Sequence, residues 1–121
     1  MKFVDQTRFG NKEGNCLAAC LASLFELDID DVPDFNALHG DNWYSIGLTS
    51  WLSQFGLVPV MLASITGEFP QNCHYLVGGE SPRGILHSCI GLNGEIVHDP
   101  HPSRAGLVRI DDYTFFIRSF V

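Results

Sequence analysis

The hydrophobic pattern of this chain changes its period about halfway along the sequence. From residue 16 to residue 55 apolar residues recur at helical spacing, and from residue 57 they form short runs bounded by glycine, proline and asparagine. Helices first and strands second predict an α+β fold, with N-terminal helices packed on a small antiparallel sheet. Neither a repeat nor a linker-like change in composition interrupts the 121 residues, so we expect one domain over residues 1–121.

The pattern also predicts where each element lies. Helices are expected from Cys16 to about Glu26 and from Trp43 or Tyr44 to Phe55, with Gly56 as a left-handed stop. Between them we expect a short acidic helical turn in LDIDDVPDF and a loop at 36–42. Strands are expected in LVPVML, at a sheet edge because of its proline, and in HYLVGG, ILHSCIGL, EIVHD and YTFFIRSF. The second helix is expected to bury Ile46, Leu48, Trp51, Leu52 and Phe55.

Composition and charge exclude several classes of partner. The hydrophobic fraction of 45% and the aromatic fraction of 12% are typical of a globular protein. The net charge is −7 and the seven Lys and Arg residues are scattered, which argues against binding to nucleic acid or to anionic membranes. No apolar run approaches the roughly 20 residues of a membrane helix, and MKFVDQTRFG lacks the apolar stretch of a signal peptide. We therefore expect a cytoplasmic protein with four reduced cysteines.

The segment EGNCLAACLASLF places a cysteine at the start of the first expected helix. Gly14 and Asn15 are loop and N-cap residues, so Cys16 is expected at the helix N-terminus. Free N–H groups and the helix dipole favour negative charge there, and reactive thiols have a pKa of roughly 3.5–7.5 instead of about 8.5. Two interpretations follow. Cys16 is an activated nucleophile, or it is a small apolar residue in the core.

A nucleophilic cysteine needs a base, and the base needs an orienting group. His87 lies in the strand ILHSCIGL, and Asp99 ends the next strand in EIVHDPHPS. Acyl transfer also needs hydrogen-bond donors for the developing oxyanion. The backbone N–H of Cys16 and the side-chain amide of Gln6 are the candidates. The residues thus suggest Cys16 as nucleophile, His87 as base, Asp99 as orienting group and Gln6 as oxyanion donor.

The hairpin signal LNG decides whether His87 and Asp99 can meet. A two-residue turn would place Leu92 opposite Glu95. His87 and Asp99 would then point to opposite faces of the sheet. A three-residue turn with a G1 bulge would place Gly91 opposite Glu95, and His87 would lie directly across from Asp99. The catalytic interpretation requires the second register, or a distortion where the Asp99-Pro100 step ends the strand.

In this order of residues the chain resembles the papain-like cysteine peptidases. Among them it is most similar to the small bacteriocin-processing peptidase domains, which cut leader peptides after a double glycine. The resemblance is specific at three places, which are Gln6 with NCLAACL, LHSCI around His87, and VHDP around Asp99. The interval between Gln6 and the cysteine is longer than in that family, and Leu17 stands where glycine is usual. Because such domains also occur as free-standing hydrolases, the resemblance implies fold and chemistry and leaves the substrate open.

Other interpretations of the same residues remain open. The second cysteine of the helix is expected in the core, although the C-x3-C spacing also permits a redox pair of Cys16 and Cys20. The base can also be His98 or His101. His87 is preferred to them mainly because of the resemblance. A zinc site formed by Cys16, Cys20, His87 and His98 has suitable ligand types, but its spacing matches no familiar zinc pattern.

The loops are expected to frame a cleft. Its borders would be the segments 36–42, 66–73 and HPSRAG, where Arg104 is either a contact for an acidic substrate group or a solvated charge. The acidic residues Asp28, Asp30, Asp31 and Asp34 lack the glycine and the closing glutamate of an EF-hand. They are expected to be solvated.

The sequence therefore predicts a thiol-dependent hydrolase, namely a peptidase, isopeptidase or amidase acting on a peptide or protein through an acyl-enzyme on Cys16. No cofactor or metal is expected to take part. Transfer of the acyl group to an amine instead of water is equally compatible with the residues. The alternative from another class is a catalytically silent papain-like binding module, for example a phage protein that blocks a host factor. The intact set of Cys16, His87 and Asp99 favours the enzyme.

Overall fold

The computed structural model describes residues 1–10 and 13–119. Its helical elements are α1 (Cys16–Phe25), the 3₁₀ turn η1 (Ile29–Asp31), α2 (Phe35–His39), the 3₁₀ turn η2 (Gly40–Asn42), the π-helical segment η3 (Trp43–Leu48) and α3 (Thr49–Ser53). The strands are β1 (Leu57–Leu62), β2 (His74–Glu80), β3 (Leu86–Leu92), β4 (Glu95–His98) and β5 (Arg109–Arg118). Helices precede strands along the chain, which confirms the α+β class.

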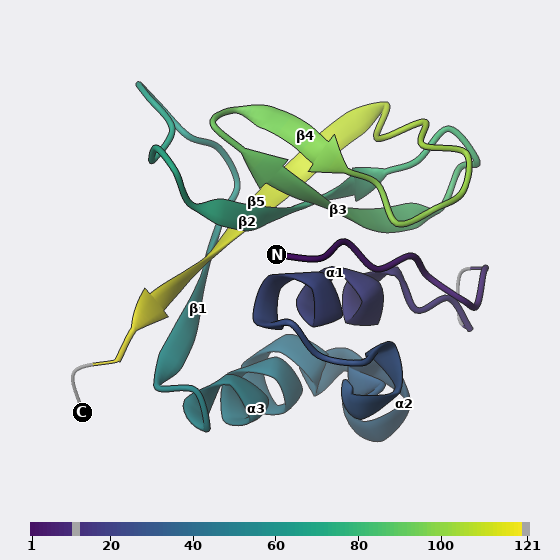
Figure 1. The fold of residues 1–121 in the computed structure, drawn as a ribbon, viewed down its shortest axis with the longest axis vertical. Coiled ribbons are helices and arrows are strands. Elements are labelled where there is room, and N and C mark those ends of the chain that lie inside the picture. The colour runs from purple at the N-terminus through teal and green to yellow at the C-terminus, as the bar shows by residue number, and fades with distance from the viewer. Residues whose placement is uncertain (11–12, 120–121) are drawn as a thin grey trace.

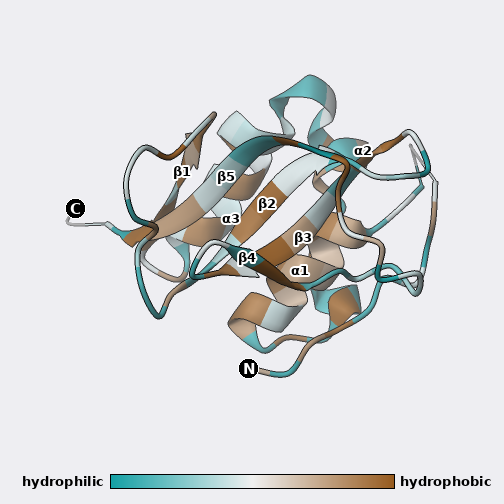
Figure 2. Cartoon of the chain, turned by 90° about the horizontal axis from the view of Figure 1, so that it is seen from above, coloured by the Kyte–Doolittle hydropathy of each residue, from teal (hydrophilic) through white to brown (hydrophobic). Residues whose placement is uncertain are grey.

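Within the described residues the five strands form one antiparallel sheet in the order β1-β5-β2-β3-β4. Strand β1 is at an edge, as its Pro59 predicted. The helices lie on one face of this sheet, with α1 directly beneath it and α2 and α3 further away (Figure 1). Viewed from above, the sheet lies over the helices, parts of which extend beyond its edges, and apolar stretches run along β2 and β3 (Figure 2).

The main core fills the space between α1, the later helices and the sheet. Five consecutive residues of α1, Ala19 to Ser23, are completely buried. The buried residues of this cluster are Cys20, Leu21, Ala22, Val32, Phe35, Leu48, Leu52, Leu76 and Ile90. Helix α1 is therefore held by packing along its whole length, and this packing fixes the position of its first residue, Cys16. No helix in the described ranges is long and apolar enough to span a membrane.

Two expectations about the helices are wrong. The segment 36–42 is helical, as α2 and η2, because Asp34 caps α2 by accepting the N–H of Ala37 at 3.2 Å. Ile46 in η3 and Phe55, two residues after the end of α3, are 49% and 40% exposed, although both were expected to be buried. The π-helical η3 explains the difference for Ile46, since i→i+5 hydrogen bonds change the spacing at which one face recurs.

Candidate active site

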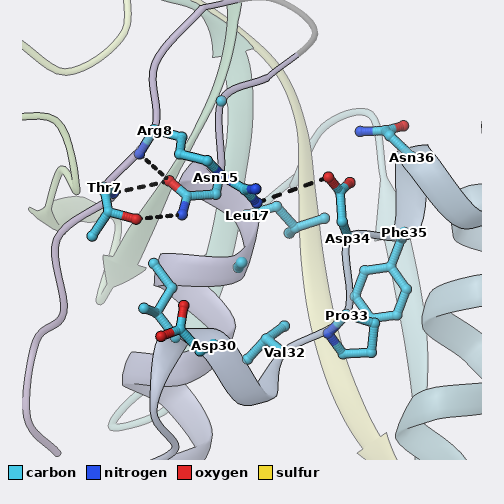
Figure 3. Close-up of a pocket in the computed structure, with 13 residues that line it drawn as sticks. Thr7, Arg8, Asn15, Leu17, Asp30, Val32, Pro33, Asp34, Phe35 and Asn36 are labelled. Carbon is cyan, nitrogen blue, oxygen red and sulfur yellow. Dashed lines mark hydrogen bonds and ion pairs between the residues drawn. The ribbon is translucent and has the colours of Figure 1, made fainter.

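The start of α1 is fixed by the side chain of Asn15. Its Oδ1 accepts the N–H groups of Thr7 and Arg8, both at 2.9 Å, and its Nδ2 donates to Thr7 Oγ1 at 2.8 Å (Figure 3). Asn15 precedes the helix as predicted, but its side chain caps no helical N–H. It instead binds the N-terminal segment beside Cys16, the first residue of the helix.

The β3–β4 hairpin has a two-residue turn. Leu92 pairs with Glu95, and both turn residues, Asn93 and Gly94, have positive φ angles of 53° and 90°. Two left-handed residues in succession are the mark of a type I′ turn. The three-residue turn that would place Gly91 opposite Glu95 is therefore wrong, and His87 does not lie directly across from Asp99.

A β-bulge at Val97 nevertheless brings the two side chains to one face. Gly91 pairs with Ile96, whereas Ile90 pairs with His98, so Val97 is the extra residue. If this register is continued by one residue, Asp99 comes opposite Cys89. Because alternate residues share a face, Asp99 then lies on the face of His87. The required distortion exists, but it lies two residues before Asp99 and not at the Asp99-Pro100 step.

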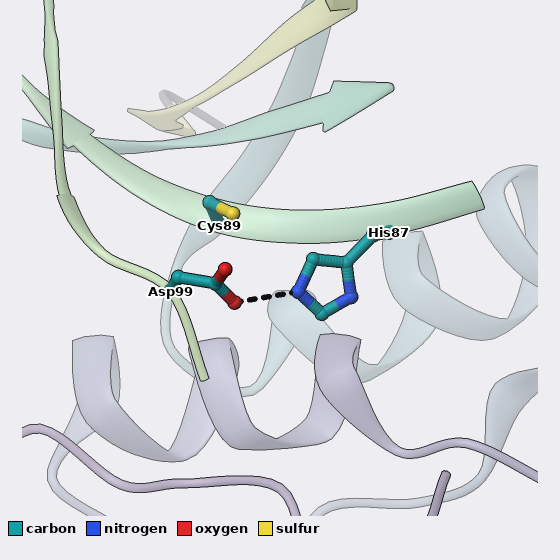
Figure 4. Close-up of side chains that lie close together, drawn as sticks. All are labelled: His87, Cys89 and Asp99. Carbon is teal, nitrogen blue, oxygen red and sulfur yellow. Dashed lines mark hydrogen bonds and ion pairs between the residues drawn. The ribbon is translucent and has the colours of Figure 1, made fainter. Parts of the chain in front are cut away.

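The result is a buried histidine–aspartate pair. His87 Nε2 lies 2.7 Å from Asp99 Oδ1, and the ring and the carboxylate point toward each other between β3 and α1 (Figure 4). The two residues are 5% and 4% exposed. With Nε2 engaged by Asp99, the other ring nitrogen, Nδ1, is the one available to Cys16.

Asp99 is held by its own loop as well as by His87. The backbone N–H of His101 donates to Oδ1 at 2.9 Å, and that of Gly106 donates to Oδ2 at 2.8 Å. Burial alone would raise the pKa of Asp99, but the hydrogen bonds from His87, His101 and Gly106 outweigh it and lower the pKa. Asp99 is therefore an anion at neutral pH.

Cys16 is half-buried at the start of α1 and completes a chain of three groups. Burial raises the pKa of its thiol, yet the hydrogen bond and charge of His87, with backbone hydrogen bonds to Ser88 and Leu17, lower the pKa overall. Burial lowers the pKa of His87, and hydrogen bonds to Cys16 and Asp99 raise it overall. Both shifts favour transfer of the thiol proton to the imidazole. The three predicted residues Cys16, His87 and Asp99 therefore lie together.

Gln6 lies beside Cys16 and His87. It is 7% exposed and lines a cavity of about 170 Å³ together with Cys16 and His87. Its Nε2 donates to the carbonyl of Arg8 at 2.9 Å, which uses one of its two N–H groups. Among the described residues its Oε1 has no partner although it is buried. The structure thus brings the predicted oxyanion donor beside the nucleophile, with one amide hydrogen uncommitted.

The alternative bases have other partners. His98 Nε2 lies 3.0 Å from the carbonyl of Val4, and its ring stacks on Phe3 with centroids 4.6 Å apart. His101 lines the cavity of Cys16, and its Nδ1 accepts the N–H of Ser103 at 3.0 Å. Neither contacts the carboxylate of Asp99 through its ring.

Within the described residues, the potential ligands that lie close together differ from the Cys16, Cys20, His87 and His98 set considered as an alternative from the sequence. His87, Cys89 and Asp99 each bring one potential ligand atom within 4.8 Å of the others (Figure 4). The 2.7 Å between His87 and Asp99 is a hydrogen-bond length. Two ligands on one tetrahedral zinc, with bonds of about 2.0–2.2 Å, would lie roughly 3.3–3.5 Å apart. The pair as it stands is therefore suited to sharing a proton.

The thiols are all free in the described structure. Cys20 is completely buried, as expected, and its Sγ lies 3.5 Å from the carbonyl of Ser88. Burial raises the pKa of both Cys20 and Cys89, so neither competes with Cys16 as a nucleophile. Cys73 is exposed.

One of the three expected borders lines the cavity at Cys16, namely the segment HPSRAG through His101. The loops 36–42 and 66–73 do not line it, whereas Phe9, Arg83 and Leu86 do. Arg104 binds Asp5 through both guanidinium Nη atoms, at 2.6 and 2.7 Å, and also donates to the main-chain carbonyl of Asp99. It is a structural ion-pair partner that ties the N-terminal segment to the Asp99 loop. In the sequence, the only hint of this role is that Arg104 lies five residues after Asp99.

Comparison of the chain with protein-family models, with curated proteins and with solved structures finds no match to any of them.

Proposed function

We propose that the chain is a thiol-dependent hydrolase of papain-like fold, a cysteine peptidase, isopeptidase or amidase that acts on a peptide or protein. The observation that carries the proposal is the buried His87, which hydrogen-bonds both Cys16 and Asp99. A base held between a thiol and a carboxylate is the arrangement that nucleophilic catalysis requires. The packing of the nucleophile helix against a sheet that carries the base supports the papain-like fold.

The first half-reaction would form an acyl-enzyme. The thiol proton of Cys16 moves to His87, and the thiolate attacks the substrate carbonyl carbon, so that an S–C bond forms and the carbonyl oxygen becomes an anion. The N–H groups at the start of α1 and the uncommitted N–H of Gln6 are the donors for this oxyanion. When the intermediate collapses the C–N bond breaks, and His87 returns the proton to the leaving amine.

The second half-reaction would release the acyl group. Water transfers a proton to His87 while its oxygen attacks the acyl carbon, and the S–C bond then breaks to regenerate Cys16. An amine that takes the place of water would give acyl transfer by the same steps. Asp99 stays ionised throughout, because its pKa is lowered, and it stabilises the imidazolium that forms in each half.

The pH dependence of alkylation tests the proposal. Iodoacetamide labelling is followed by mass spectrometry at each cysteine, with the exposed Cys73 as the reference thiol in the same molecule. At pH 6 we expect Cys16 to react at least about tenfold faster than Cys73, because a thiolate held by an imidazolium persists at low pH. His87→Ala should remove this difference.

Two results would contradict the proposal. Equal rates at Cys16 and Cys73 in the wild type would mean that the thiol is not activated. A loss of labelling in His101→Ala that is absent in His87→Ala would show that the base is His101. If Cys16 is activated but no peptide or protein substrate is found, capture of partners by the Cys16→Ala variant tests the binding-module alternative.

A further inference from the structure

A second cavity lies beside the start of α1 and is larger than the one over Cys16. Its volume is about 280 Å³, and it lies between the residues around the helix start and the segment 29–36 (Figure 3). Asn15 and Leu17, the two neighbours of Cys16 in sequence, both line it, and Gly14 lines both cavities. The second cavity therefore begins within one residue of the nucleophile.

The walls of this cavity combine an apolar floor with an acidic rim. Leu17, Val32 and Phe35 supply apolar surface, and Val32 and Phe35 belong to the main core. Asp30 and Asp34 stand at the rim and are exposed. Within the part of the chain that the structure describes, Asp30 has no hydrogen-bond or ion-pair partner. The volume is just below the roughly 300–1,000 Å³ of pockets that hold whole small-molecule ligands, so a single long side chain fits it better.

The protein already places one cation at this rim. Arg8 also lines the cavity, and its Nη2 lies 3.9 Å from Asp34 Oδ2 (Figure 3). Both side chains are about half exposed, and 3.9 Å is too long for a hydrogen bond, so this ion pair holds Arg8 weakly. The position of Arg8 thus shows that the rim accepts a positive charge. A substrate cation can replace Arg8 beside Asp34 with little loss of free energy, because the existing ion pair is weak.

We propose that this cavity is a substrate subsite for a lysine or arginine side chain close to the bond that Cys16 attacks. The inference rests on the proposed hydrolase function and names the class of substrate, a peptide or protein with a basic residue next to the scissile bond. The methylene stem lies on the apolar floor, and the cationic end reaches Asp30 and Asp34. The net charge of −7 also favours the approach of basic substrates.

Active-site-directed probes test the subsite. N-acetyl dipeptidyl chloromethyl ketones carry lysine, norleucine or glutamate at the first or second position before the reactive carbonyl, and alanine at the other. The thiolate of Cys16 displaces chloride and forms an S–C bond, which intact mass spectrometry follows. For one of the two positions we expect the lysine probe to label Cys16 about two- to fivefold faster than norleucine, with glutamate slowest.

Matched charge variants make the assignment specific. Asp30→Asn combined with Asp34→Asn should bring the lysine probe down to the norleucine rate. Asp28→Asn combined with Asp31→Asn removes the same charge from the same segment outside the cavity, so it should leave the preference unchanged. Loss of the preference in both double variants would attribute it to general electrostatics and overturn the subsite. Equal rates for lysine and norleucine in the wild type would also overturn it.

Failure of the subsite and failure of the hydrolase proposal give different results. Iodoacetamide labelling of Cys16 reports the activated thiol alone, so an activated Cys16 without a lysine preference rejects only the subsite. Binding can be read without any reaction in the Cys16→Ser protein, by NMR titration with N-acetyl-lysine amide. Shifts confined to the amides of Leu17, Val32 and Phe35 are expected, and their absence at millimolar ligand rejects the subsite.

Discussion

At the scale of single residues, Asp99 has the most connected side chain of the candidate site. It accepts hydrogen bonds from the His87 ring and from two backbone N–H groups, those of His101 and Gly106. Gly106 has a φ of 73°, a conformation that suits glycine, and this conformation aims its N–H at the carboxylate. An anion with three donors is pre-organised to hold a charged imidazole.

Replacing this carboxylate is expected to lower stability in a pH-dependent way. Asp99→Asn should lower the free energy of unfolding at pH 7 by about 1–3 kcal/mol, because the amide leaves one of the three N–H donors without an acceptor. The folded pKa of Asp99 is lowered, so its stabilisation is complete above the unfolded pKa of about 3.9 and is lost as the pH falls through the folded value. Urea unfolding should therefore show a difference in unfolding free energy between wild type and Asp99→Asn that is constant down to about pH 5 and narrows progressively below about pH 4.

The control for this series is Asp41→Asn, an exposed aspartate of η2 that lies outside the candidate site. Its unfolding free energy should follow that of the wild type at every pH. A gap between wild type and Asp99→Asn that keeps its full pH 7 size at pH 3 would mean that the charge of Asp99 is not its cause.

At the scale of elements, the sequence predicts the helix and strands that form the site better than it predicts the register between those strands. Helix α1 begins at Cys16 as expected, because the turn residues before it and the apolar stripe after it are local signals. The strand that carries His87 is likewise confirmed, and so is the next strand, which ends at His98, one residue before Asp99. Their register is not, since a bulge depends on the sheet around it. The short α2 was missed because five residues carry too little periodicity.

A deletion inside a strand normally turns the following side chains to the other face of the sheet, but deletion of the bulge residue Val97 should not. Val97 is 41% exposed and is the extra residue of the hairpin, so its removal leaves His98 opposite Ile90 and keeps Asp99 on the face of His87. The variant lacking Val97 should therefore retain fast labelling of Cys16 at pH 6. The variant lacking Ser88 should lose it, because a deletion inside a regular strand turns His87 to the other face.

Circular dichroism and amide NMR spectra should confirm that both deletion variants are folded before labelling rates are compared. Slow labelling in a folded protein without Val97 would show that the register alone does not align Asp99. Fast labelling without Ser88 would remove His87 as the base.

At the scale of the whole molecule, the N-terminal segment connects the helices to the sheet. Val4 N–H donates to Ser23 Oγ of α1 at 2.8 Å, and its carbonyl lies 3.0 Å from His98 Nε2 of β4. Gln6 N–H donates to the carbonyl of Pro100 at 3.0 Å. Figures 1 and 2 together show the segment running along the edge of the molecule, beside both α1 and the sheet. From the sequence it is only an irregular polar stretch, because single hydrogen bonds to residues more than 90 positions away leave no periodic signal.

The firmest attachment of this segment is Asn15, which leads to the last prediction. Asn15→Ala removes the acceptor of the Thr7 and Arg8 N–H groups, so we expect unfolding to become easier by about 1–3 kcal/mol. Amide exchange of Thr7 and Arg8 should accelerate far more than that of the α1 interior. Asn15→Asp keeps the acceptor oxygen and accepts the Thr7 hydroxyl, so it should preserve most of the stability and protection. If Asn15→Asp is as destabilised as Asn15→Ala, or if exchange accelerates equally throughout α1, the segment is not held by this side chain. The expected pattern would instead establish that Asn15 holds Gln6 at the site, since the carbonyl of Arg8 is the acceptor for the Gln6 side chain.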